Sequence, residues 1–238
     1  MFLPTPQPAP AEWPVAGDVR IAQSEPSWTF VIEPFIWFAG LDGQGEAGTA
    51  PPVDFRHTAA DVFGSFDAGF LLALEARAPG DRWSIIADGL YLRLADDEGL
   101  ADTETEATML EIGGALPLGE SGSLDLIGGL RYVDLSFDVQ IGAAIDQTAR
   151  QTWVDPWIGA RGIIPIDETW AVHLRGDIGG FGVGSKFSWQ ALGVLSAQLG
   201  KGWRFDAGYR AIGIDYDDGD LAFDTRVHGP LIGFAWSS

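Results

Sequence analysis

Apolar and polar residues alternate along this chain with a period of two from Trp28 onward. In 66–77, for example, Phe70 and Leu72 share one face while Glu75 and Arg77 share the other. Such alternation over short segments predicts half-buried β-strands. About ten segments of this kind occur, and an even number of about 8 to 12 strands predicts an all-β fold, a single antiparallel up-and-down β-barrel. The segments are 28–38, 66–77, 82–93, 104–116, 123–132, 154–161, 170–178, 189–199, 203–210 and 230–236.

The connections between these segments indicate which face of the barrel is inside. A water-soluble barrel turns its apolar face inward, whereas a transmembrane barrel turns it toward lipid. Short connections alternate here with longer ones, which is the layout of outer-membrane barrels and predicts a transmembrane barrel with both termini on the short-turn, periplasmic side. The short connections lie near Ala78–Asp81, Leu118–Ser121, Pro165–Glu168 and Leu199–Gly202, and the longer ones near Gly40–Ser65, Ala95–Asp102, Ile141–Thr148, Gly182–Lys186 and Asp217–Asp220.

Aromatic residues gather at the predicted strand ends and share the apolar face. Amphipathic rings of this kind form girdles at the two interfaces of a membrane. The sequence therefore predicts an aromatic girdle at the short-turn end and a second one toward the other rim. The first consists of Trp28, Trp83, Trp170, Trp203 and Trp236, and the second of Phe38, Tyr91, Tyr132 and Trp189.

The opposite face of the strands is rich in charge of both signs. Arginine stays charged and makes bidentate bonds to carboxylates, which suits a crowded barrel interior. We therefore expect an ion-pair network inside the barrel, with nine acids and six arginines. Its members are Glu33, Asp67, Glu75, Arg77, Asp88, Glu111, Asp125, Arg131, Asp155, Arg161, Arg175, Asp177, Arg204, Asp206 and Arg210.

Composition excludes several classes of function. The chain has 238 residues, no cysteine and a formal net charge of −20, so disulfide frameworks, thiolate metal sites and nucleic-acid binding are not expected. No run approaches the 18 or so apolar residues of a transmembrane helix. The histidines are too scattered for a zinc site, and the acidic stretch 215–220 lacks the full calcium-loop pattern, so it predicts a solvated loop. We expect no cofactor, no metal and no catalytic residue.

The first 27 residues differ from the rest of the chain. They contain several prolines and no periodicity, which predicts an extended periplasmic tail (1–27) before the barrel (28–238). They show neither the basic start nor the apolar stretch of a secretory signal. Either the chain is not exported, or it is a mature or truncated form.

Seven further stretches together span most of 28–236, namely 33–37, 74–77, 129–132, 153–161, 175–182, 208–210 and 229–233. In these stretches the chain resembles a group of Gram-negative outer-membrane β-barrel proteins sometimes called porin-like. The resemblance implies the barrel fold and a location in the outer membrane, with outer-membrane lipid or lipopolysaccharide and the barrel-assembly machinery as partners. It implies no activity. The chain departs from the usual aromatic C-terminus, because Ser237 and Ser238 follow Trp236.

The leading functional expectation is a structural or narrow-pore barrel, with weak cation preference if it conducts. One alternative is an outer-membrane hydrolase or acyltransferase with His57 or His228 beside Asp54 or Asp224. Another is a soluble, lipocalin-like barrel that binds an apolar ligand in an apolar interior. The long first connection, 41–65, with a short helix at 56–64, is a candidate cap or plug of the interior. Proline at positions 34 and 230 predicts a bulge where the first and last strands pair.

Overall fold

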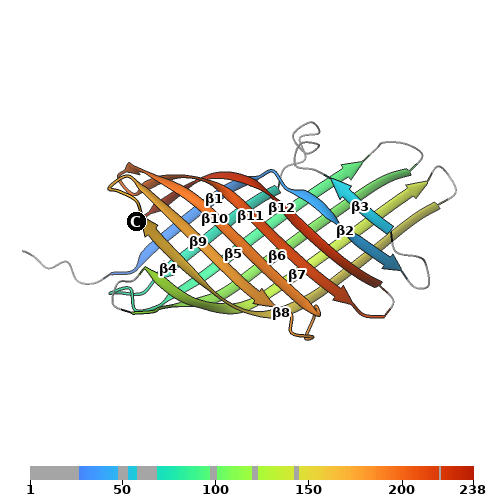
Figure 1. The fold of residues 1–238 in the computed structure, drawn as a ribbon, viewed down its shortest axis with the longest axis horizontal. Coiled ribbons are helices and arrows are strands. Elements are labelled where there is room, and N and C mark those ends of the chain that lie inside the picture. The colour runs from blue at the N-terminus through green and yellow to red at the C-terminus, as the bar shows by residue number, and fades with distance from the viewer. Residues whose placement is uncertain are drawn as a thin grey trace, which may run out of the picture.

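In the computed structural model, the chain forms one closed antiparallel barrel (Figure 1). The structure describes residues 27–47, 53–57, 69–96, 101–119, 123–141, 145–219 and 221–238. Its twelve strands form one sheet that closes on itself because β1 pairs with β12. In two places, two of the twelve segments together make up one interrupted strand of the barrel wall. The wall therefore has ten strands, as the sequence predicts. Among the described residues, no helix is long and apolar enough to cross a membrane.

The strands are named in chain order. They are β1 (Thr29–Trp37), β2 (Gly40–Ala47), β3 (Val53–His57), β4 (Gly69–Arg77), β5 (Ser84–Asp96), β6 (Ala101–Pro117), β7 (Leu124–Ile141), β8 (Ile145–Pro165), β9 (Trp170–Gly179), β10 (Phe187–Gly200), β11 (Trp203–Asp217) and β12 (Leu221–Ser237). We call the end of the barrel where β1 begins and β12 finishes the terminal end, and the opposite end the distal end. In Figure 1 the terminal end lies to the left.

The seam between the first and last strands is interrupted but not shifted. β1 and β2 form one wall strand against β12, and the ladder skips Phe38 and Ala39, opposite Gly229 and Pro230. It also skips Glu33 and Pro34, the second of which has no N–H to donate. The register is the same on both sides of each interruption, so the predicted bulge is absent and only ladder pairs are lost.

Two of the distal connections are shorter than the sequence predicts. β5 continues to Asp96 before β6 starts at Ala101, and β7 continues to Ile141 before β8 starts at Ile145, so most of these expected loops is barrel wall. The cap or plug expected at 41–65 is also wrong where it can be followed. β2 pairs with β12, and β3 pairs with β2, so both belong to the wall. Residues 58–64 of the expected helix lie outside the described residues.

The charged face of the strands points inward. Arg131, Asp155 and Asp206 have no exposed surface, while Phe70 and Ile112 on the outer wall are each 60% exposed. The five tryptophans of the expected terminal girdle are also exposed on the outer wall. This arrangement is the reverse of a soluble barrel with an apolar core, and it is the arrangement of a barrel surrounded by lipid. Of the expected second girdle, Tyr91 and Tyr132 are exposed, and Phe38 and Trp189 are half-buried.

Candidate functional site

The centre of the barrel interior holds a closed ring of two arginines and two carboxylates from β6, β7 and β9. Arg131 donates from Nε to Glu111 at 2.6 Å and from Nη2 to Asp177 at 2.5 Å. Arg175 donates to the other oxygens of the same two carboxylates, at 2.6 Å and 3.1 Å. Charge-assisted bonds of this kind are short and directional. We call Glu111, Arg131, Arg175 and Asp177 the central ring.

The central ring is linked to the opposite wall by Gln190 and Arg210. The Gln190 amide donates to Asp177 at 2.9 Å, and its oxygen accepts from Arg210 Nε at 2.9 Å. Arg210 in turn donates to Asp88 at 2.9 Å on β5. The guanidinium of Arg210 also lies 5.9 Å from the ring centre of Trp37, within cation–π range. This chain of polar side chains therefore crosses the interior from one wall to the other.

Two further clusters lie nearer the terminal end. In the first, Arg161 binds Glu75 at 2.5 Å and Asp125 at 2.8 Å, and Arg77 also pairs with Glu75 at 3.2 Å. In the second, Arg204 pairs with Glu33 and, at 2.8 Å, with Asp206. Together with the central ring and the Arg210–Asp88 pair, these clusters contain thirteen of the fifteen expected network residues. Those thirteen are Glu33, Glu75, Arg77, Asp88, Glu111, Asp125, Arg131, Arg161, Arg175, Asp177, Arg204, Asp206 and Arg210.

The other two expected members differ. Asp155 is buried, but among the described residues it accepts hydrogen bonds from neutral donors and not from an arginine. It accepts from the N–H and the hydroxyl of Ser185, both at 2.7 Å, and from Trp153 Nε1 at 3.0 Å. These bonds tie the β9–β10 turn to β8. Asp67 lies outside the described residues.

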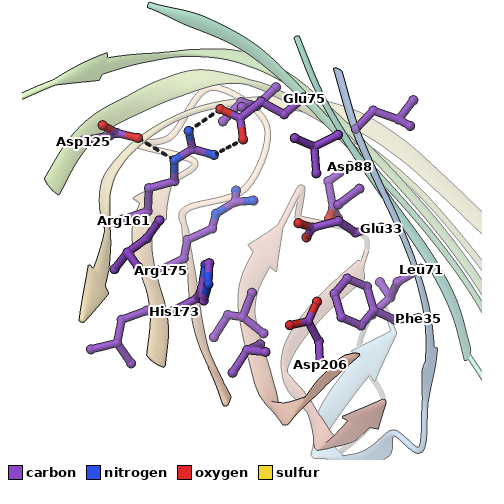
Figure 2. A pocket seen from close by; sticks show the side chains of 18 of the residues that line it. Glu33, Phe35, Leu71, Glu75, Asp88, Asp125, Arg161, His173, Arg175 and Asp206 are labelled. Atoms are coloured by element: carbon purple, nitrogen blue, oxygen red, sulfur yellow. Dashed lines mark hydrogen bonds and ion pairs between the residues drawn. The ribbon is translucent and has the colours of Figure 1, made fainter. Parts of the chain in front are cut away.

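A cavity of about 150 Å³ lies among these clusters. Figure 2 shows Glu75, Arg161 and Asp125 bonded on one side and Glu33 and Asp206 on another. A polar cavity of this size has room for several waters. His173 also lines it, together with apolar side chains such as those of Phe35 and Leu71.

An apolar layer lies in the interior distal to the central ring. It begins one inward position further along the strands, at Met109 after Glu111 and at Val133 after Arg131. Most of the strands contribute to it. Its members include Trp37, Leu92, Met109, Val133, Trp153, Ile212, Tyr216 and Phe223. Sequence analysis did not identify this layer, although Phe35 and Trp37 already placed large apolar residues on the polar face of the first strand.

The polarity of the wall reverses at the same level. On β7 the outer positions pass from Leu130 through Tyr132 to Asp134, while the inner positions pass from Arg131 to Val133. The terminal half of the barrel is therefore apolar outside and charged inside, and the described distal part is charged outside and apolar inside. The change coincides with an outer belt of exposed tyrosines, Tyr91, Tyr132 and Tyr209, which we call the tyrosine belt.

Each hydroxyl of the tyrosine belt bonds to a charged or titratable side chain. Tyr91 donates to Glu106 at 3.1 Å, and Tyr132 is 3.5 Å from Asp134. Tyr209 lies 2.6 Å from His228 Nδ1. Distal to the belt, the hydrogen bonds from Arg150 lower the pKa of Asp134. Such paired polar groups mark the level at which the outer wall meets water.

Of the residues of the enzyme alternative, only the side chains of His228 and Asp224 can be followed, and these two do not pair. His228 bonds to Asp42 at 2.9 Å and not to Asp224, and it lies on the outer wall. The side chains of His57 and Asp54 lie outside the described ones. In the acidic stretch 215–220, Asp217 pairs with Lys186 at 2.6 Å, which lowers the pKa of Asp217. In the part of the chain that the structure describes, no group of three or more acids and histidines is placed to hold a metal ion.

Comparison with solved structures places this geometry among known folds. The outer membrane protease OmpT from Escherichia coli superposes with a TM-score of 0.60, covering 89% of this chain and 98% of that one at 9% identity. The fold is that of an outer-membrane β-barrel. The translocator domain of the autotransporter NalP from Neisseria meningitidis (TM-score 0.45, 13% identity, 87% and 88% covered) and a major outer membrane protein from Thermus thermophilus (0.43, 13%, 89% and 100%) are more distant. Neither a family model nor a curated protein matches the sequence. At such identities the likeness concerns the barrel fold, not the activity.

Proposed function

We propose that this protein is a structural barrel of the bacterial outer membrane with a closed interior, and not a diffusion pore. The observation that carries the proposal is the pair of layers across the interior. The central ring is buried, and the apolar layer distal to it draws on most of the strands. Ions would have to pass an apolar section with no polar partners, which costs several kcal/mol per charge.

The outer wall supports the location. Between the terminal tryptophans and the tyrosine belt, the exposed residues are almost all apolar, as a surface in contact with acyl chains requires. The polar wall beyond the belt then stands outside the hydrocarbon. We propose that lipid of the outer membrane is the first partner of this surface, with acyl chains on the apolar band and headgroups at the tyrosine belt.

Planar-bilayer recording of the purified, refolded barrel tests the closed interior. We expect no discrete conductance steps from the unaltered protein. The conductance of two variants is compared with that of the unaltered protein. Trp153→Gly with Tyr216→Gly removes two aromatics of the apolar layer and should open steps if that layer closes the interior, whereas the matched control Trp83→Gly removes one aromatic from the outer wall and should open none. Steps from the unaltered protein that disappear when the protein is omitted would refute the proposal.

A further inference from the structure

We propose that the distal part of β8 is a docking edge for an extended, basic polypeptide segment, which adds to the barrel wall as an extra strand. The site is a gap in the wall between β8 and β11, on the distal side of the short β9–β10 hairpin. The inference requires the barrel fold but not the closed interior, so a conductance measurement leaves it untouched.

Strand pairing defines the gap. β8 pairs with β7 along its whole length, from Ile145 to Gly162, but its pairing with β9 stops at Trp157. On the other side, β11 pairs with β10 only as far as Asp215. Two strands are therefore missing distal to this level. Three strand spacings of about 4.8 Å set an upper limit of about 14 Å between β8 and β11 there. Because the Tyr216 hydroxyl on β11 lies 3.5 Å from Gln151 on β8, we infer room for one added strand.

The backbone of β8 is oriented toward this gap at alternate residues. Pro156 offers its carbonyl to the N–H of Gly180, so the residues of the same parity, Val154, Thr152 and Arg150, also face away from β7. The β9–β10 turn covers the backbone of Val154, because Gly184 lies against the Val154 carbonyl. The turn does not cover the backbone of Thr152 and Arg150. Within the described residues neither has a strand partner on that side, and both are exposed. Such an edge is a template for an incoming strand.

Aromatic side chains close the gap from inside. Trp153 on β8 and Tyr216 on β11 meet with ring centres 4.6 Å apart. Both are buried in the apolar layer. An added strand would therefore lie in the wall, outside these rings, and would not enter the barrel.

The charge around the gap selects a basic occupant. Its borders carry four acids, Asp134, Asp215, Asp217 and Asp218, against two bases, Arg150 and Lys186. Both bases are already paired with acids of the gap, Arg150 with Asp134 and Lys186 with Asp217. Four acids less two bases leaves a net charge of −2, and this excess attracts cationic side chains.

A second copy of this chain does not fit the edge. Two barrels in one membrane present β8 in the same direction, with strands tilted by about 35–45° of the same hand. Where they face each other the two edges cross at about 80°, twice that tilt, and cannot form a ladder. The occupant is therefore a segment from another polypeptide, free to adopt the orientation of β8.

A pair of peptides tests the inference on the unaltered barrel in detergent. The probe is a short fluorescent peptide of alternating lysine and valine, and its control has the same sequence with N-methyl groups at alternate residues. Both have the same charge, but the control cannot form a ladder on one edge. We expect the control to bind about tenfold more weakly or worse, as the loss of two or more backbone hydrogen bonds requires. Equal binding, or no binding of either peptide, overturns the proposal.

Cross-linking locates the contact. Since the chain has no cysteine, Thr152→Cys introduces a single thiol at the edge, and Gln44→Cys introduces one on the distal outer wall as a control. A probe ending in cysteine should form a disulfide several times faster with the first variant. Equal rates would indicate non-specific attraction to the acidic surface, and barrel-to-barrel disulfides in preference to peptide would identify a second copy; either result overturns the proposal.

Discussion

Removing Arg131 should destabilise the barrel more than any other single interior charge. In Arg131→Met the aliphatic stem stays, but two bonds of 2.6 Å and 2.5 Å to Glu111 and Asp177 are lost in a site with no exposed surface. Breaking a buried pair costs 3–5 kcal/mol, because a charge is left without its partner. Here Arg175 still contacts both carboxylates, so we expect the lower end, about 3 kcal/mol.

The assay is urea unfolding of the refolded barrel in lipid vesicles, followed by tryptophan fluorescence and by the gel shift between unboiled and boiled protein. Arg93→Met is the matched control, because its pair with Glu106, at 3.9 Å, lies on the exposed wall and should contribute at most about 1 kcal/mol. Adding Glu111→Gln to Arg131→Met should recover part of the loss, because Arg175 and Asp177 then remain as one balanced pair. A loss below about 1 kcal/mol for Arg131→Met would refute the view that the ring stabilises the interior.

Three further predictions follow from single features of the wall. A Cβ at Gly229 would lie 1.9 Å from the Phe38 carbonyl, whereas at Gly114 the nearest atom is 3.8 Å away, so Gly229→Ala should lower the urea midpoint and Gly114→Ala should leave it nearly unchanged. In vesicles of brominated lipid, a variant that keeps only Trp203 should be quenched, and one that keeps only Trp37 should not, because Trp203 is exposed and Trp37 is fully buried; equal quenching would contradict the assignment of the faces. Arg150→Gln should raise the pKa of Asp134 toward its ordinary value, as measured by carboxyl-carbon NMR, since the hydrogen bonds from Arg150 lower that pKa.

The period of two was sufficient to predict the barrel, because side chains alternate strictly between the two faces of a strand. It could not predict which charges pair. Arg161 on β8 meets Glu75 on β4, 86 residues earlier in the chain, and that meeting depends on how strand tilt and register bring distant strands to one level. Asp155 shows the same limit, since its partner Ser185 comes from a turn whose position the alternation does not encode.

The distal apolar layer escaped prediction for a different reason. In 123–132, most apolar residues have the outer parity, whereas Val133 and Leu135 have the inner one. A change of parity resembles the end of a strand, so the segment was predicted to stop at Tyr132. The backbone in fact continues without a bulge to Ile141, and it is the surroundings of the wall that change, from lipid to water.

The reversal of polarity also sets the position of the barrel along the bilayer normal. If the barrel sank by one pair of residues along each strand, the charged groups beyond the tyrosine belt, Asp134 and Arg150 among them, would enter hydrocarbon. If it rose by the same amount, Leu130 and its neighbours would be exposed to water. Arginine on a lipid-facing wall costs up to about 2–4 kcal/mol at the bilayer midplane and less near the interface. Summed around the circumference, these free-energy costs hold the barrel at one position along the bilayer normal. A bilayer of another thickness must therefore adjust to the protein.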